Sequence, residues 1–162
     1  MAKAGLVFQK RDEWATPKEI VDMFGPFEYD PATTKEQAEY LGIPNYDTIK
    51  TNGLDSDWTK YKKIWVNPPF TKKFEFLLKA TQELEWMDGD AEICFLMLID
   101  SLVTKSFHDI IVGTNYDLYT PNKRIQFDDG SGRKSSPAFG SVILKLGYMD
   151  SSIKHFEIDR NG

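Results

Sequence analysis

The stretch from Ile64 to Phe70, read IWVNPPF, places an amide, two prolines and an aromatic ring directly after three apolar residues. Proline has no backbone N–H, so Pro68 and Pro69 remove two donors from this turn and leave their carbonyl acceptors on a rigid backbone. The Asn67 side chain adds a third acceptor, and Phe70 adds an aromatic face. Such an array is complementary to a planar ring that carries an exocyclic amino group.

An aromatic amine is a poor nucleophile, because its lone pair is delocalised into the ring. Acceptors on the Asn67 side chain and the Pro68 carbonyl would favour the pyramidal nitrogen that attacks an electrophile, and preorganised dipoles of this kind contribute about 3 kcal/mol each. Phe70 could stack on the ring for about 1–3 kcal/mol. Asn67 is neutral and cannot act as a strong base, so we expect the proton to leave after the transfer. A strand that happens to end in two prolines is the alternative interpretation.

Helices and strands alternate along most of the chain. The pattern Thr16, Pro17 and Glu19 predicts a helix with a capping box and a proline in its first turn. Apolar spacing and caps predict further helices over 34–41, 72–85 and from Thr104, whereas strands are predicted over 27–29, 63–66, 93–99, 116–119, 125–127 and 141–146. Residues 43–62 read as a long polar loop. This order predicts an α/β sandwich with a mostly parallel sheet and an antiparallel C-terminal edge, in which ligands bind at the carboxyl ends of the strands.

Length and composition bound the class of protein. The 162 residues predict a single domain over 1–162, with a flexible N-terminus over 1–13 and a C-terminal extension over 147–162. One cysteine, Cys94, lies in an apolar run, and two histidines give no support for a metal site. No stretch approaches the roughly 20 apolar residues of a membrane helix, so we expect a soluble cytoplasmic protein. The net charge of −5 argues against non-specific nucleic-acid coating but allows a local basic face.

Five segments in this order resemble the small phage-borne DNA adenine-N6 methyltransferases often called phage Dam, which use S-adenosylmethionine. The segments are Trp14 to Pro17, Asp30, Asn52 to Leu54 with Trp58, Trp65 to Phe70, and Arg124 to Phe127 followed by Ser135 to Phe139. The resemblance spans about residues 14–146 and implies a Rossmann-like methyltransferase sandwich, in full or reduced form. By itself, NPPF is shared with enzymes that methylate RNA bases or protein glutamine.

The resemblance implies a role for individual residues. The catalytic set is Asn67 and Pro68 as amine acceptors, Pro69 as the rigid element and Phe70 as the stacking ring. The cofactor-binding set is Thr16, Pro17, Asp30, Pro31, Ala32 and Asn52, with Asp30 holding the ammonium or the ribose hydroxyls. In place of a glycine-rich loop the chain has residues 31–34, and Asn52 stands where relatives often carry an aspartate.

Basic side chains near NPPF and in a late loop are candidate phosphate contacts. They are Lys72, Lys73, Arg124, Arg133 and Lys134. The expected partner is double-stranded DNA in a host bacterial cytoplasm, with no metal, and the expected use is protection of phage DNA from host nucleases. Two alternatives stay open: an enzyme of the same fold that methylates RNA or a protein amide, and a catalytically silent descendant that binds DNA or a host protein.

Overall fold

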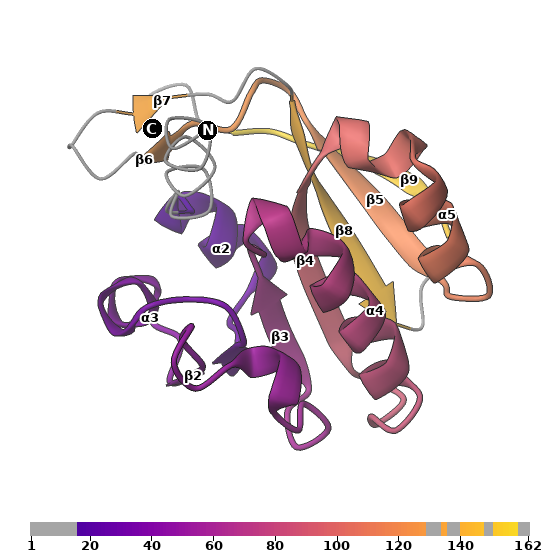
Figure 1. Ribbon diagram of the computed structural model, residues 1–162. Coiled ribbons are helices and arrows are strands. Elements are labelled where there is room, and N and C mark those ends of the chain that lie inside the picture. Colours follow the sequence, from indigo (N-terminus) through magenta and orange to yellow (C-terminus); the bar gives the residue numbers. More distant parts are fainter. Residues whose placement is uncertain (1–15, 129–133, 136–139, 148–150, 159–162) are drawn as a thin grey trace, which may run out of the picture.

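The computed structural model describes residues 16–128, 134–135, 140–147 and 151–158 (Figure 1). Its helices are α2 (Lys18–Phe24), α3 (Lys35–Leu41), α4 (Lys73–Leu84) and α5 (Lys105–Ile111), with short 3₁₀ turns η1 (Gly53–Asp55), η2 (Phe70–Lys72) and η3 (Ile99–Val103). Its strands are β1 (Tyr29–Asp30), β2 (Asn45–Tyr46), β3 (Lys63–Val66), β4 (Glu92–Leu98), β5 (Tyr116–Pro121), β6 (Phe127–Asp128), β7 (Lys134–Ser135), β8 (Ser141–Gly147) and β9 (Ile153–Phe156).

Seven strands form one sheet in the order β2-β1-β3-β4-β8-β5-β9, and β6 pairs with β7 in a separate antiparallel ribbon. All pairs in the large sheet are parallel except the two made by β8, with β4 and with β5. The predicted α/β fold with a mostly parallel sheet is confirmed. The antiparallel strand comes from the C-terminal part, as predicted, but it lies inside the sheet. The strand at that edge is β9, which is parallel to β5 and was not predicted.

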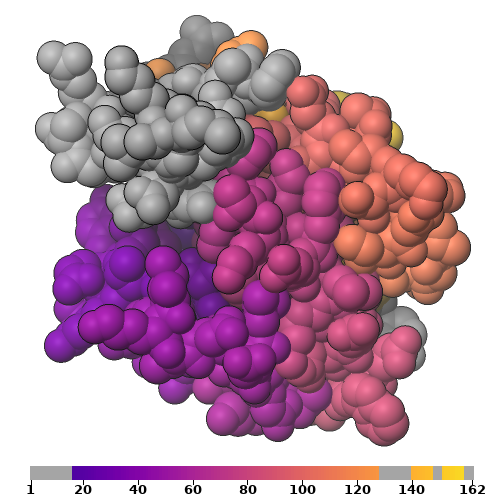
Figure 2. Space-filling model, viewed as in Figure 1, coloured from indigo at the N-terminus to yellow at the C-terminus, as the bar shows by residue number. Residues whose placement is uncertain are grey.

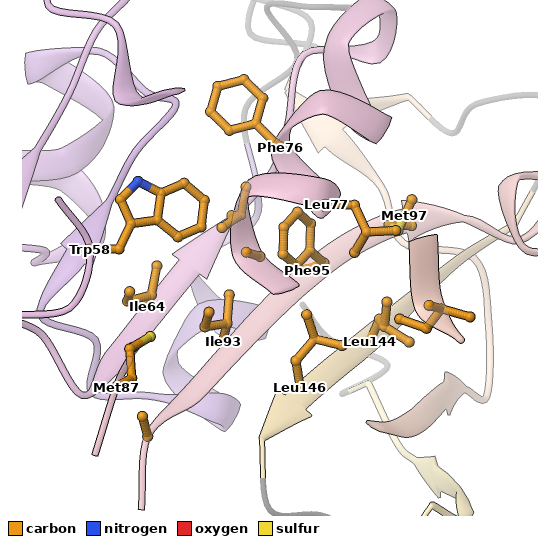
Figure 3. Packing of buried hydrophobic residues seen from close by; sticks show 14 of the residues in the cluster. Trp58, Ile64, Phe76, Leu77, Met87, Ile93, Phe95, Met97, Leu144 and Leu146 are labelled. Carbon is orange, nitrogen blue, oxygen red and sulfur yellow. The ribbon is translucent and has the colours of Figure 1, made fainter. Parts of the chain in front are cut away.

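Helices cover both faces of the sheet. On one face, side chains of α4 and α5 join those of β4 and β8 in the cluster shown in Figure 3, which includes Phe76 and Leu77 of α4 and Ile93 and Phe95 of β4. On the other face, α2, the end of α3 and the segment around residue 125 form a second cluster. β4 contributes to both clusters, because alternate residues of a strand point to opposite faces. Its prediction as a doubly covered strand is confirmed.

The start of α2 differs from the prediction. Pro17 is the N-cap residue, and no side chain caps the helix. Its carbonyl accepts hydrogen bonds from the N–H groups of Ile20 and Val21, at 3.2 and 3.5 Å. The predicted capping box with Thr16 and Glu19 is therefore wrong, because the threonine hydroxyl turns away to a different partner described below. By contrast, the predicted caps of α3 and α5 are present, with Thr34 accepting from Gln37 N–H and Thr104 from Phe107 N–H.

Residues 43–62 are not one irregular loop. They contain β2, which extends the sheet beyond β1, and the turn η1. A strand of two residues is too short to show a periodic pattern in the sequence. The residues of β2 form a strand because β1 provides their hydrogen-bond partners. Along the described residues, no helix has the length and apolar character needed to cross a membrane.

Candidate functional site

Four parallel strands end at the same edge of the sheet, which we call the carboxyl edge. Asp30 ends β1, Asp47 follows β2, Asn67 follows β3 and η3 follows β4. The chain leaves β1 toward β2 on one side and leaves β3 toward β4 on the other, so the strand order reverses between β1 and β3. In open α/β sheets, ligands bind at this switch point. The two predicted halves of the site, Asp30 and the NPPF turn, therefore flank the position where the fold favours a ligand.

The NPPF turn connects β3 to α4 through η2. Pro69 has extended backbone angles, φ −53° and ψ 136°, and its carbonyl accepts the N–H of Lys72 at 3.0 Å. That hydrogen bond closes η2 and engages one of the two proline carbonyls. Among the described residues, no donor meets the Pro68 carbonyl. The Pro68 carbonyl is therefore the proline acceptor that can meet an incoming amino group.

Asn67 contacts the segment before α2. Its Nδ2 donates to Oγ1 of Thr16 at 2.9 Å, across 51 residues of sequence. Thr16 is 4% exposed, and its carbonyl accepts Nε2 of Gln37 from α3 at 3.3 Å. The structure thus brings Thr16 to the catalytic candidate Asn67, a contact that the sequence did not reveal.

Phe70 is partly exposed and lies beside a lysine. The Nζ of Lys73 is 4.0 Å from the centre of the Phe70 ring and 5.2 Å from that of Phe74. Burial lowers the pKa of Lys73, and the carboxylate of Asp100 in η3 opposes that shift. The ammonium of Lys73 thus lies over an aromatic face of the turn, and its contact with phosphate stays a prediction.

The carboxyl of Asp30 is 2% exposed. Its Oδ1 accepts the N–H of Ala32 at 2.9 Å. Burial raises the pKa of Asp30 to about 7, and the hydrogen bond from Ala32 opposes the shift only partly. Among the described residues, no cationic side chain pairs with this carboxyl. A buried acid without a counter-charge is suited to a ligand that brings a cation or hydroxyl donors.

Asp47 is a candidate that the sequence reading missed. Its Oδ2 accepts the hydroxyls of Tyr29 at 2.5 Å and Ser56 at 2.6 Å. Burial opposes ionisation, but the hydrogen bonds from Ser56, Tyr29 and Thr51 together lower the pKa of Asp47. The available signal was the repeat of Tyr-Asp at 29–30 and 46–47, which places an acid after each of two short strands.

The segment after Asp47 folds back against the β1 turn. A side chain at Gly53 would place its Cβ 1.9 Å from the Pro31 carbonyl oxygen, so only glycine fits there. The indole N–H of Trp58, which is fully buried, donates to the Gly53 carbonyl at 2.9 Å. Figure 2 shows this purple part of the chain against the magenta α4, which contacts η1. Gly53 and Trp58 of the predicted motif therefore fix this segment against the turn that follows β1.

Asn52 begins η1 with a positive φ of 55°. Its side-chain oxygen accepts the N–H of Leu54 at 3.2 Å, and its Nδ2 donates to Asp55 at 2.9 Å. The side chain of Asn52 therefore caps this turn, and its contact with a cofactor stays a prediction. Its place beside the β1 turn keeps it at the carboxyl edge.

The other predicted phosphate contacts are distributed differently. Lys72 and Arg124 are exposed, on η2 and before β6. Arg133 and the side chain of Lys134 lie outside the described residues. The structure therefore supports an accessible basic position next to NPPF at Lys72, while the late loop stays a prediction.

The NPPF turn after β3 and the buried carboxyl of Asp30 flank the switch point of a mostly parallel sheet, which is the arrangement expected from the resemblance to α/β methyltransferases. The family model described as DNA N-6-adenine-methyltransferase (Dam) matches residues 3–149, and the chain belongs to this family. A protein of Escherichia phage T1, named DNA N-6-adenine-methyltransferase, is 30% identical over 79 residues. That match covers 46% of this chain and 32% of the phage T1 protein, so the shared part is about a third of that relative. A solved structure of a protein from Thermoplasma acidophilum has a TM-score of 0.40 and 12% identity, over 86% of this chain and 65% of that one.

Proposed function

We propose that the protein is an S-adenosylmethionine-dependent methyltransferase that modifies the N6 amine of adenine in DNA. The observation that carries this proposal is the NPPF turn, which follows β3 beside the switch point in a chain of the Dam family. In the reaction, the N6 lone pair would form a bond to the methyl carbon, and the carbon–sulfur bond would break with its electron pair left on sulfur. N6 would then release one proton to solvent, because Asn67 is neutral and cannot act as a strong base.

In this proposal, the Asn67 side-chain oxygen and the Pro68 carbonyl accept the two N6 hydrogens. These contacts strengthen as N6 becomes pyramidal and positive, so they stabilise the transition state more than the ground state. Pro69 keeps the turn rigid, and its own carbonyl is engaged by Lys72. Phe70 stacks on the adenine after the base rotates out of the duplex.

The cofactor supplies an electrophilic methyl group on a positively charged sulfur. The residues at the carboxyl edge fit it, because the buried Asp30 carboxyl has one oxygen on Ala32 N–H and no cationic partner among the described residues. Asp30 would hold the ammonium or the ribose hydroxyls. We propose that the remaining contacts come from Thr16 and Pro17 before α2, from the Pro31–Ala32 turn and from Asn52.

Contacts with DNA phosphates are proposed for Lys72, Lys73, Arg124, Arg133 and Lys134, and the segments 43–62 and 128–137 are proposed to meet the duplex. Lys73 would have to leave the face of Phe70 to reach a phosphate. The proposed biological use is protection of phage DNA from host nucleases, in the bacterial cytoplasm.

The decisive experiment is incubation with methyl-labelled S-adenosylmethionine and, separately, DNA, RNA and protein. We expect label in DNA as N6-methyladenine. Asn67→Ala should lose about 3 kcal/mol of transition-state stabilisation, roughly a hundredfold in rate. Asn115→Ala is a matched control, because Asn115 is exposed and precedes β5 at the opposite edge of the sheet. Label in RNA or protein but not in DNA would refute the proposal, and so would an Asn67→Ala rate equal to the wild-type rate.

A binding measurement separates an enzyme from a silent descendant. S-adenosylhomocysteine at 100 times its Kd should stabilise the folded protein by about 2.7 kcal/mol. A thermal shift with this ligand that disappears in Asp30→Ala supports the cofactor site. Unchanged melting at millimolar ligand, together with retained DNA binding, would favour the silent descendant.

A further inference from the structure

Thr16 stands next to the N-cap of α2, yet its hydroxyl does not cap the helix. A threonine at the N-cap position ordinarily accepts an N–H of the first turn, but in α2 this position is occupied by Pro17. Here the hydroxyl accepts Nδ2 of Asn67 at 2.9 Å, and the residue is 4% exposed. The Thr16 hydroxyl therefore contacts the NPPF turn and not the start of α2.

The contact matters because an amide side chain has two unlike ends. Rotation by half a turn exchanges a donor for an acceptor, and the two orientations have nearly the same shape. Only the orientation that presents oxygen to the substrate can accept an amine hydrogen. In the observed orientation, Nδ2 faces the Thr16 hydroxyl and the oxygen end of the amide faces away from it.

Thr16 is itself held in place by a second element. Its carbonyl accepts Nε2 of Gln37 at 3.3 Å, and Gln37 also donates its backbone N–H to the Thr34 cap of α3. On the C-terminal side, the Pro17 carbonyl starts α2. A buried residue fixed by two helices offers Asn67 a preformed partner, and preformed partners hold a reacting group in its productive geometry.

We propose that Thr16 is a positioning residue, which orients the Asn67 amide so that its oxygen faces the adenine amine. This inference rests on the proposed function and assigns the Thr16 hydroxyl to Asn67, so that the cofactor contact proposed for this residue is left to its backbone, which valine keeps. The two roles make different predictions. A cofactor ligand sets the affinity for S-adenosylmethionine, whereas a positioning residue sets the rate of methyl transfer from the bound complex.

The test compares Thr16→Val with Thr16→Ser in the full chain. Valine has the same shape and no hydroxyl, and serine keeps the hydroxyl. We expect Thr16→Val to lower kcat about 10- to 100-fold, because small misplacement of a reacting group costs up to about a hundredfold. Its Kd for S-adenosylhomocysteine should stay within about twofold of wild type. Thr16→Ser should restore kcat to near the wild-type value. Thr81→Val makes the same chemical change on α4, where the hydroxyl donates to the Leu78 carbonyl, and should leave kcat unchanged.

A double-mutant cycle identifies the partner. If Thr16 acts through Asn67, then Thr16→Val added to Asn67→Ala should cost no further rate. Multiplicative losses in the double variant would overturn the inference, as would a Thr16→Val variant that loses cofactor affinity and keeps kcat. If Asn67→Ala alone keeps the wild-type rate, the proposed function itself is refuted, and this single variant shows it without the double-mutant cycle.

Discussion

Replacing Asp30 by asparagine should change how the stability of the protein depends on pH. Asp30 is 2% exposed, and burial raises its pKa from 3.8 to about 7. Between these two values the unfolded chain has lost the proton that the folded chain keeps. The folded state therefore binds more protons, and the free energy of unfolding falls as pH rises through this window.

The magnitude follows from the two pKa values. A difference of about 3 pKa units at about 1.36 kcal/mol each gives a loss of about 4 kcal/mol. Nearly all of this loss accumulates between pH 4 and pH 7, and stability levels off above the folded pKa. Asparagine does not titrate, and its oxygen can still accept the Ala32 N–H, so the variant lacks this component. Any constant cost of burying the amide cancels when the variant is compared with wild type at several pH values.

Urea unfolding followed by tryptophan fluorescence at pH 4, 6, 7 and 8 measures the effect. From pH 4 to pH 8, the free energy of unfolding of Asp30→Asn should rise by about 3–4 kcal/mol relative to that of wild type. A difference that stays constant with pH, within about 0.5 kcal/mol, would refute the assignment of a raised pKa to Asp30. Saturation with S-adenosylhomocysteine should reduce the pH dependence of wild type, since a bound ammonium or hydroxyl would favour the ionised carboxyl.

Three further perturbations test the surroundings of the site. Gly53→Ala should destabilise the protein by about 1–3 kcal/mol and weaken cofactor binding, since its Cβ would lie 1.9 Å from the Pro31 carbonyl oxygen; wild-type melting and affinity would contradict this packing. Asp117→Asn should lower the free energy of unfolding by about 3 kcal/mol at pH 7, because the buried carboxylate binds Lys154 of β9 at 3.0 Å and accepts the N–H of Ser152. The pKa of Asp117 is lowered in the folded state, so the stability advantage of wild type should fade as pH falls. Chemical unfolding of both proteins at pH 7 and pH 3 checks both points. Arg133→Ala combined with Lys134→Ala should weaken DNA binding and flatten its salt dependence by up to about two units of slope, and equal affinity at several salt concentrations would remove the late loop from the interface.

The sequence identified the centre of the candidate site because its chemistry is local. Two consecutive prolines between an asparagine and a phenylalanine fix an acceptor-rich turn whatever surrounds it. The apolar run of β4 is likewise a local property, and so are the threonine caps of α3 and α5. These features were predicted because neighbouring residues alone determine them.

The tertiary structure decided what depends on residues far apart in the chain. Nothing near Thr16 in sequence distinguishes a helix cap from a partner of Asn67, since the two residues meet only when β3 and the start of α2 pack together. In the same way, β2 and β9 exist as strands because β1 and β5 supply their hydrogen-bond partners. The raised pKa of Asp30 is also a tertiary effect, because desolvation depends on what the fold places over the carboxyl. Sequence thus determined which groups can do the chemistry, and the packing of distant segments determined how those groups are oriented and charged.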